Sequence, residues 1–245
     1  MGGKKAQYGY YGLPKIAIPV AVIVGIGIII GLFWLKWLGV AISCFGIYLI
    51  LSYLITLYVI NRREAPDLKK MLRLEGSENV LDVGCGLGRM AIGVAKLLTT
   101  GKVVGIDIWD RMELISNCPE RAYENAQVEG VRDKVEFKTG NILSIPFTDG
   151  SFDLVTSSSV VNSLHTKVEK LNALKEIFRV LKPGGTFLLM EPIKSWATFF
   201  LFTPLAFWVL SSKDFWSELL NKANFTSPSY SYWSGMGIFL TEKPK

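Results

Sequence analysis

The stretch that most constrains the fold is residues 80–89, where an apolar run is followed by three glycines at alternate positions and then by helical periodicity. This order predicts a buried strand, a tight turn and the start of a helix. Glycine is required where the backbone takes a positive φ or where a ligand must approach closely. The free N–H groups at a helix start favour carboxylate or phosphate groups. The stretch therefore predicts a site for a nucleotide-like ligand, with Gly84, Gly86 and Gly88 forming the turn.

Beyond Asn79 the chain alternates between strand-like and helix-like patterns. A βαβα order implies a parallel sheet covered on both faces, so we expect an α/β, Rossmann-like, doubly wound sheet of seven strands. Ser234 and Gly235 separate the last two runs, which predicts an antiparallel hairpin at the end of the sheet. The expected strands are residues 80–83, 102–107, 135–138, 152–157, 186–190, 225–232 and 237–241. The expected helices are residues 89–98, the second half of 112–128, 167–181 and 213–223, with a turn at 182–185.

Residues 16–60 form a long apolar stretch whose only charged residue is Lys36. The stretch is about twice the roughly 20 residues that cross a ~30 Å hydrocarbon core, and it is far too long for a signal peptide. Tryptophans favour the membrane interface and a lone lysine extends its charge towards it, so Trp34, Lys36 and Trp37 mark the middle of the stretch. We therefore expect a transmembrane helical hairpin over residues 15–35 and 37–60.

Basic residues flank the apolar stretch on both sides, and the formal net charge is +6. Attraction to anionic lipid explains these charges more simply than nucleic-acid binding, so the bilayer is the expected partner and nucleic acid is not. The same charges predict that both ends of the hairpin, and the domain after it, lie on the cytoplasmic side. Three cysteines without paired spacing indicate neither a disulfide framework nor a zinc site, so no metal is expected. The flanking basic residues are Lys4, Lys5, Lys15, Arg62, Arg63, Lys69 and Lys70.

On this basis the chain divides into three parts. Residues 1–61 hold a tail and the hairpin, residues 62–75 a basic connector, and residues 76–245 the α/β domain. In the connector, apolar residues alternate with basic ones. Such a helix either lies on the membrane surface or packs its apolar stripe on the next domain.

The glycine spacing argues against a dinucleotide cofactor. The dinucleotide fingerprint is G-x-G-x-x-G, but Arg89 stands where its third glycine belongs, and Asp82 lies inside the strand end. The next strand ends in Asp107, and ligands of open α/β sheets bind beyond the carboxyl ends of the strands. A carboxylate there can accept both hydroxyls of a ribose, or it caps the following helix. The neighbouring glycine loop favours the ribose role.

Five motifs occur in order along the chain: D-V-G-C-G-L-G (residues 82–88), G-I-D (105–107), T-G-N before I-P-F (139–147), S-F-D-L-V (151–155) and R-V-L-K-P-G-G (179–185). Together they resemble the class I S-adenosylmethionine-dependent methyltransferases, most of all the methyltransferase domain 11 group, which includes quinone and sterol methylases. The resemblance extends from about residue 70 to residue 245. It implies S-adenosyl-L-methionine as the cofactor and methyl transfer as the reaction.

The resemblance also implies a role for several positions of these motifs. The glycine loop, with Cys85, would hold the methionine part of the cofactor, and Asp82 would contact its amino group through water. Asp107 would bind the ribose. Ile108 and Trp109 follow as further cofactor contacts, and Trp109 either stacks on the adenine or covers the sheet edge.

Further along the chain, Asn141 would contact the adenine amine, with the backbone of Ile142 beside it. The family usually has Asp at this position, but an amide oxygen also accepts from an amine. Ser157 and Ser158, at the end of the fourth strand, would line the methionine end. The chain departs from the family in residues 108–119, which add several residues before the next helix and end in a proline that argues against one continuous helix.

Methyl transfer needs little covalent help from the protein, because the sulfonium is already activated and alignment supplies much of the rate. A base is required only where the acceptor must lose a proton. His165, the only histidine, follows the fourth strand, and Glu191 ends the fifth, so each is a candidate catalytic residue. The alternatives are a solvated residue at a helix start for His165 and a cap or hydrogen-bonding partner at the sheet edge for Glu191.

Residues 196–208 form an aromatic stretch that is too short to span a bilayer. It is either ordinary core or, the favoured reading, a lid that dips into the membrane interface and admits a lipid-soluble acceptor. The sequence as a whole predicts a membrane-anchored methyltransferase for a small hydrophobic acceptor, such as a quinone precursor, a lipid, a sterol or a thiol. One alternative is a non-catalytic, membrane-anchored regulatory or assembly protein with the same fold. A nicotinamide- or flavin-dependent oxidoreductase is a weaker alternative.

Overall fold

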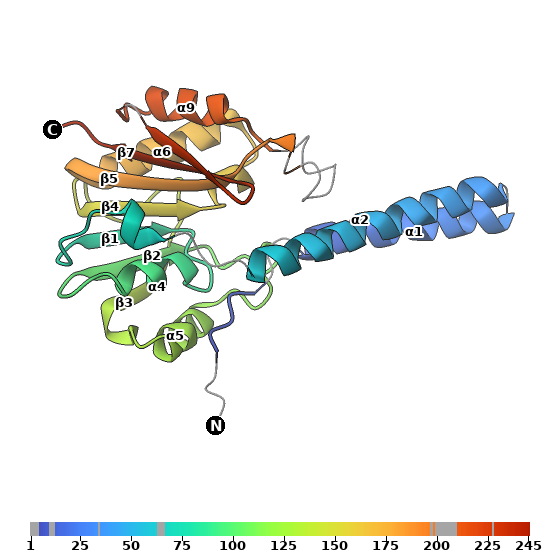
Figure 1. The fold of residues 1–245 in the computed structure, drawn as a ribbon, viewed down its shortest axis with the longest axis horizontal. Helices are drawn as coiled ribbons and strands as arrows, with labels where there is room; N and C mark the ends of the chain where they lie inside the picture. The colour runs from blue at the N-terminus through green and yellow to red at the C-terminus, as the bar shows by residue number, and fades with distance from the viewer. Residues whose placement is uncertain are drawn as a thin grey trace.

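A computed structural model describes residues 5–9, 13–33, 35–62, 67–196, 198, 210–226 and 228–245. The described residues form an α/β body and a pair of long helices that projects from it (Figure 1). The helices are α1 (Leu13–Phe33), α2 (Lys36–Arg62), α3 (Leu68–Met71), α4 (Arg89–Ala95), α5 (Pro119–Val128), α6 (Lys167–Val180) and α9 (Lys213–Lys222). The strands are β1 (Asn79–Val83), β2 (Lys102–Asp107), β3 (Val135–Thr139), β4 (Phe152–Ser158), β5 (Leu181–Pro192), β6 (Ser229–Trp233) and β7 (Met236–Glu242).

The seven strands form one sheet in the order β3-β2-β1-β4-β5-β7-β6. Strands β1 to β5 pair in parallel, whereas β7 runs antiparallel to both β5 and β6. The order reverses between β1 and β4, which places a topological switch point at the end of β1. The predicted doubly wound sheet with a terminal antiparallel hairpin is therefore confirmed.

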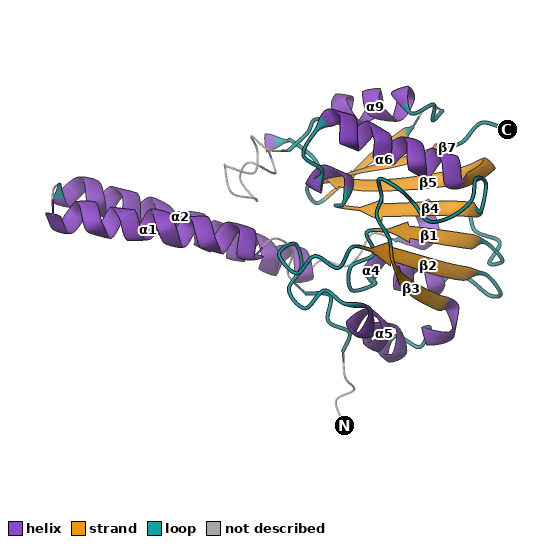
Figure 2. Ribbon diagram, turned by 180° about the vertical axis from the view of Figure 1, so that it is seen from behind, coloured by secondary structure: helices purple, strands orange, loops and turns teal. Residues whose placement is uncertain are grey.

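Helices lie on both faces of the sheet (Figure 2), and a hydrophobic cluster is buried on each face. Side chains of a strand point alternately to opposite faces, so neighbours such as Val80 and Leu81 enter different clusters. One cluster holds the apolar stripes of α6 and α9, including Leu174 and Trp216. The other holds those of α4 and α5, including Ile92. Both faces are buried, as the near-continuous apolar strands require.

The predicted boundaries differ from the structure most clearly in strands β5 and β6. Strand β5 begins at Leu181 and passes through residues 182–185, which were expected to be a turn. There the Gly184 N–H donates to Lys243 O at 2.8 Å, so pairing with the chain end keeps the segment extended despite a φ of +77° at Gly184. Strand β6 begins at Ser229, later than expected. Helix α5 begins at Pro119, which occupies the first turn, so the predicted break in residues 108–119 is confirmed.

Helices α1 and α2 lie antiparallel, and the chain reverses between Phe33 and Lys36 (Figure 1). Glycines bring the two backbones close together: a Cβ on Gly39 would lie 2.3 Å from the Cα of Gly31. Among the described residues, only the segment Lys36–Ile55 is long and apolar enough to cross a membrane, judged by length and composition. The apolar part of α1, Ala17–Phe33, is shorter. The helical hairpin is thus confirmed as structure, and its passage through a bilayer stays a prediction.

The connector forms one helical turn, α3, in which the Asp67 carboxylate caps Lys70 N–H at 3.3 Å. Leu68, Met71 and the buried Leu72 pack against the cluster beneath α4 and α5. Of the two readings of the connector, packing on the next domain is therefore the one that the described residues bear out. Residues 63–66 lie outside the described part.

The hairpin leaves the body on the side where the parallel strands end (Figures 1 and 2). In α/β sheets that edge is also where ligands bind. The predicted aromatic stretch falls almost wholly outside the described residues, so the choice between lid and core stays open there. Of its described members, Trp196 is exposed and Thr198 is buried.

Candidate cofactor site

The turn after β1 holds its glycines in a left-handed backbone conformation, with φ of +70° at Gly84 and +84° at Gly88. Gly84 and Cys85 donate their N–H groups to Ile106 O at 2.8 and 3.0 Å, which ties the turn to β2. A side chain at Gly84 has no room, because a Cβ there would lie 2.2 Å from Cγ2 of Val160. The glycine at this position is thus required by close packing as well as by φ.

Asp82 is buried beneath the turn and joins three elements. Its carboxylate accepts from the Ala91 N–H of α4 at 3.0 Å and from the Thr156 hydroxyl of β4 at 2.7 Å. Burial, with a smaller contribution from the negative charge of Asp107, raises the pKa of Asp82 to about 7. In this structure Asp82 braces the turn, and its predicted contact with the cofactor amino group stays a prediction.

Asp107 ends β2 and receives three protein donors. The Gly86 N–H donates to Oδ2 at 2.8 Å, and the Trp109 N–H donates to Oδ1 at 2.7 Å. The amide of Asn117 also donates to Oδ1, at 3.1 Å. The structure thus brings Asp107, the residue predicted to bind the ribose, together with the glycine turn at the switch point.

Asn117 was missed by the sequence reasoning. It is buried, and its Oδ1 atom has no hydrogen-bond partner among the described residues. A buried carbonyl oxygen without a donor is costly, so a ligand hydroxyl or amine beside Asp107 would stabilise it. The departure of residues 108–119 from the family pattern was the only signal for this residue, because it showed that the segment has its own structure.

Trp109 adopts a φ of +60°, and its indole N–H donates to the Thr139 hydroxyl at 3.1 Å. The ring also packs against the cluster beneath α4 and α5. These contacts match the reading in which Trp109 covers the sheet edge, and stacking on adenine stays untested. Ile108, next to it, is 61% exposed.

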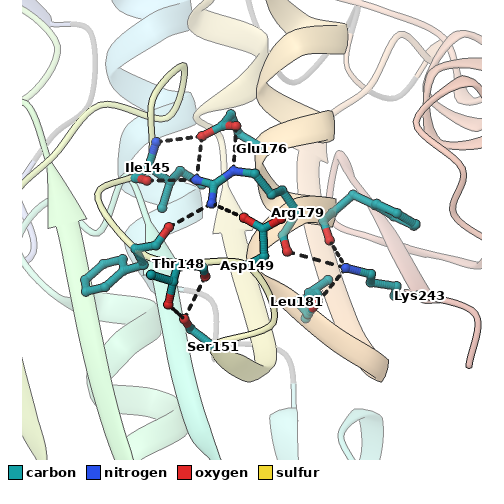
Figure 3. Close-up of polar contacts among 10 residues, drawn as sticks. Ile145, Thr148, Asp149, Ser151, Glu176, Arg179, Leu181 and Lys243 are labelled. Carbon is teal, nitrogen blue, oxygen red and sulfur yellow. Dashed lines mark hydrogen bonds and ion pairs between the residues drawn. The ribbon is translucent and has the colours of Figure 1, made fainter.

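Asn141 is exposed, and its side-chain oxygen accepts from the Leu143 N–H at 2.9 Å, while Ile142 is buried. The loop that carries these two residues is held by Arg179 of α6 (Figure 3). The guanidinium donates to Ile145 O at 2.9 Å, to Phe147 O at 2.8 Å and to the carboxylates of Asp149 and Glu176. Two motifs far apart in sequence thus form one anchor for the loop that was predicted to meet the adenine.

Ser157 and Ser158 end β4 as predicted, and Ser157 is buried. The Ser157 hydroxyl has no hydrogen-bond partner among the described residues. Cys85 is also buried, and burial raises the pKa of its thiol well above the usual value. The Cys85 side chain packs in the cluster beneath α4 and α5, and its backbone N–H and C=O bond to Ile106 O and to the Gly88 N–H.

Glu191 lies fully buried at the end of β5, beside the helical turn Val161–Ser163. Its Oε1 atom accepts from the Val161 N–H at 2.9 Å, and Oε2 has no hydrogen-bond partner in the described part of the chain. Lys170 of α6 holds the same turn by donating to Val161 O and Asn162 O at 3.1 and 2.7 Å. Burial raises the pKa of Glu191 to about 8.

His165 is exposed and directly precedes the N-cap of α6. Thr166 and Glu169 form a capping box there, with reciprocal hydrogen bonds of 3.1 and 2.9 Å. This location agrees with the reading of His165 as a solvated residue at a helix start. Within the described ranges, no three His, Cys, Asp or Glu side chains lie together as a metal site would require.

The donors and acceptors at this edge fit S-adenosylmethionine. The Asp107 carboxylate suits a ribose, and two buried oxygen atoms, on Asn117 and Ser157, have no partner among the described residues and suit the polar ends of a bound ligand. The turn is built around glycines, which have no side chain, so a ligand can approach its backbone closely.

A family model described as "Methyltransferase domain" matches residues 74–222. The demethylmenaquinone methyltransferase of Lactococcus lactis is 35% identical over 128 residues, which cover 52% of this chain and 46% of that protein. The chain thus spans about half the length of the curated relatives it matches.

Solved structures share the fold at low identity. A SAM-dependent methyltransferase from Aquifex aeolicus has a TM-score of 0.58 at 22% identity, with 71% of this chain and 86% of that chain covered. The [4+2]-cyclase SpnF has a TM-score of 0.54 at 22% identity, with 70% and 76% covered. The chain belongs to the methyltransferase domain family, and S-adenosylmethionine is the cofactor that this membership indicates.

Proposed function

We propose that the chain is an S-adenosylmethionine-dependent methyltransferase, anchored in a membrane by the α1–α2 hairpin, that methylates a small hydrophobic acceptor dissolved there. The hydrogen bond from the Gly86 N–H to Asp107 carries the cofactor part of this proposal, because it joins the turn and the carboxylate into one ligand cradle. When bound, the cofactor supplies an activated methyl group on a sulfonium.

In the proposed complex, Asp107 accepts a ribose hydroxyl beside its three protein donors, and the Asn117 oxygen accepts from a neighbouring polar group. The Ser157 hydroxyl lies at the end of β4, where the methionine end is expected. Asn141 and the Ile142 backbone would meet the adenine from a loop that Arg179 keeps in place. These residues bind and orient the cofactor, and alignment of the reacting atoms supplies much of the rate of a methyl transfer.

Glu191 is the stronger of the two candidate bases. Its buried Oε2 atom has no hydrogen-bond partner among the described residues. The raised pKa keeps this carboxyl mostly protonated at neutral pH. It therefore acts as a base only after it has lost its own proton, and it can then take a proton from the methyl acceptor. His165 is the alternative base. It follows β4 in the chain and is exposed to solvent.

The membrane part of the proposal rests on α1 and α2. Their outward faces are apolar and exposed along most of the hairpin, and Lys36 lies at its tip. A water-exposed apolar face of this length is unfavourable, whereas a bilayer would cover it. The exposed apolar residues of the hairpin include Ile18, Val22, Ile29, Leu32, Leu38, Phe45 and Leu51.

The body is joined to the hairpin at the edge of the sheet where the cofactor is expected to bind (Figure 2). An anchored enzyme with this geometry holds its reactive edge next to the bilayer, on the side that carries the flanking lysines and arginines. Exposed apolar residues on the loop after β2, Ile108, Met112 and Ile115, lie on the same edge. A lipid-soluble acceptor then has a short path from the bilayer to the cofactor.

A quinone precursor is the acceptor that the similarity favours, because a relative carries the name demethylmenaquinone methyltransferase. Incubation of the full chain in lipid nanodiscs with S-adenosylmethionine labelled in the methyl group, and with extracted quinones, lipids or sterols, tests this. We expect label in a quinone-type product. Label found only in a lipid or sterol would show that the acceptor is not a quinone, and the protein would still be a methyltransferase.

Two other functions give different results in the same preparation. A non-catalytic member of the fold would bind S-adenosylhomocysteine and label nothing; the occurrence of this fold in a [4+2]-cyclase shows that the fold alone does not fix methyl transfer. An oxidoreductase would bind NAD(H) in preference to S-adenosylhomocysteine. Absence of S-adenosylhomocysteine binding to the unmodified chain would overturn the proposed function.

A further inference from the structure

A short segment before the hairpin, residues 5–9, lies against the α/β body and is called the strap here. The Gln7 N–H donates to Asn125 Oδ1 at 2.8 Å, and Asn125 Nδ2 donates back to Gln7 O at 2.9 Å. These reciprocal bonds join residues that are 118 positions apart in the chain. An amide side chain that pairs with both backbone groups of one residue fixes the position of that residue as a strand partner would.

Asn125 also reaches the glycine turn. Its Nδ2 atom donates to Leu87 O at 2.9 Å, and the side chain is buried on α5. Leu87 lies between Gly86 and Gly88, so the bonded carbonyl belongs to the part of the turn with the fewest side-chain restraints. One amide side chain therefore holds both the strap and the turn.

The next two strap residues lie over the same turn. The guanidinium carbon of Arg89, the first residue of α4, lies 4.9 Å from the ring centroid of Tyr8. A Cβ on Gly9 would lie 2.8 Å from Leu114 and 3.4 Å from Leu87, so the strap backbone packs tightly on both side chains. Burial raises the pKa of Tyr8 to about 12, which keeps its phenol neutral.

Several glycines in one turn make it flexible, and a flexible turn loses conformational entropy when a ligand orders it. Contacts that order the turn before binding reduce that loss and increase affinity. The strap and Asn125 supply such contacts at Leu87 and Arg89. Neither the strap nor Asn125 was among the predicted site residues, because neither carries a motif.

We propose that Asn125 is a positioning residue for the cofactor, which holds the glycine turn in its binding conformation by pinning the strap across it. This inference rests on the proposed function, since it concerns the same cofactor site. The strap is the segment that leads into α1, so the chain covers its cofactor turn with the residues that precede the hairpin.

The test uses two substitutions at Gln7, of which one keeps the backbone N–H and the other removes it. Gln7→Pro removes the N–H that Asn125 accepts, whereas Gln7→Ala keeps it. The full chain in detergent micelles is titrated with S-adenosylhomocysteine by calorimetry. We expect Gln7→Ala to bind like the unmodified chain and Gln7→Pro to bind about fivefold more weakly, the equivalent of one buried hydrogen bond.

Asn125→Ala removes both sets of bonds and is expected to weaken binding about tenfold or more, whereas Gln127→Ala, an exposed change on the same helix, leaves it unaltered. If the two residues act together, adding Gln7→Pro to Asn125→Ala weakens binding little further than Asn125→Ala alone. A general loss of stability does not produce this non-additivity. Hydrogen exchange at residues 86–89 should rise in both variants.

Equal affinity of Gln7→Pro and Gln7→Ala overturns the inference, whether or not Asn125→Ala folds. Full additivity of the two substitutions also overturns it. The unmodified chain separates this outcome from failure of the proposed function: if it binds no S-adenosylhomocysteine, the cofactor assignment is wrong. If the unmodified chain binds S-adenosylhomocysteine and the two Gln7 variants have equal affinities, only the strap inference is wrong.

Discussion

The Gly86 N–H donates to Oδ2 of Asp107 at 2.8 Å, across 21 positions of the chain, and so joins the turn after β1 to the end of β2. With the Trp109 N–H and the Asn117 amide on the other oxygen, the carboxylate receives three protein donors. A carboxylate offers about four acceptor sites, so capacity for a ligand hydroxyl remains, chiefly on Oδ2. The turn and the proposed ribose ligand are therefore one unit, and a change in either alters both.

Asp107→Asn tests this unit directly. The amide nitrogen cannot accept from Gly86 or from a ribose hydroxyl, so we expect affinity for S-adenosylhomocysteine to fall about tenfold or more, the scale of a hydrogen bond to a charged group. Asp110→Asn is the matched control, because Asp110 accepts from the Met112 N–H outside the turn. Calorimetric titration of both variants is the measurement, and equal affinities would remove Asp107 from the site.

Gly84→Ala is expected to destabilise the body more than Gly130→Ala does. Both glycines have a left-handed backbone, φ +70° and +73°, which costs an alanine about 1–2 kcal/mol. A Cβ at Gly130 has no neighbour within 4 Å in the described part of the chain, whereas one at Gly84 would lie 2.2 Å from Val160, and such overpacking adds about 1–3 kcal/mol. Chemical unfolding of the two variants gives the difference, and similar losses would show that Val160 moves aside freely.

Glu191→Gln is expected to flatten the dependence of stability on pH. The pKa of Glu191 is about 8 in the folded protein and 4.5 ordinarily, so the folded form binds the proton more tightly than the unfolded chain. Its stabilising contribution is complete below about pH 4.5 and is lost as the pH rises to about 8. Asp82 acts in the same direction between 3.8 and about 7.

The measurement for this prediction is the melting temperature of the full chain in detergent from pH 5 to pH 8. The unmodified chain should lose several degrees across that range, and Glu191→Gln should lose fewer. Glu136→Gln, which changes a surface carboxylate paired with Lys138, serves as control and should keep the slope of the unmodified chain. An unchanged slope in Glu191→Gln would mean that this carboxyl is ionised in the folded protein.

The hairpin gives a fourth prediction. Gly39→Leu places a side chain where the two backbones meet, 2.3 Å from Gly31, whereas a Cβ on Gly25 has no described residue within 4 Å. Close backbone approach at small residues is what holds helices together in a bilayer. Gly39→Leu should therefore lower the melting temperature of the helical circular-dichroism signal in detergent, by overpacking worth about 1–3 kcal/mol or more. Gly25→Leu should leave it unchanged, and equal melting of both variants would contradict the packing.

Local patterns in the sequence determined much of this protein. Apolar alternation and glycine punctuation were enough to predict all seven strands, the turn after β1 and the helical hairpin, because these depend on side chains near each other in the chain. The end of β2 at Asp107 followed in the same way, since a carboxylate at a strand end lies beside the neighbouring turn in a parallel sheet. Family membership needed only the order of the motifs.

Tertiary structure decided the contacts that join distant segments. Residues 182–185 are extended because the chain end pairs with them, although their composition favours a turn. Asn117 lies against Asp107, and Asn125 holds both Gln7 and Leu87, through side chains whose partners no local pattern marks. The hydrogen bonds between Gln7 and Asn125 join residues that are 118 positions apart and form only when folding brings the two segments together. Only the folded chain could therefore reveal that the strap before the hairpin covers the glycine turn.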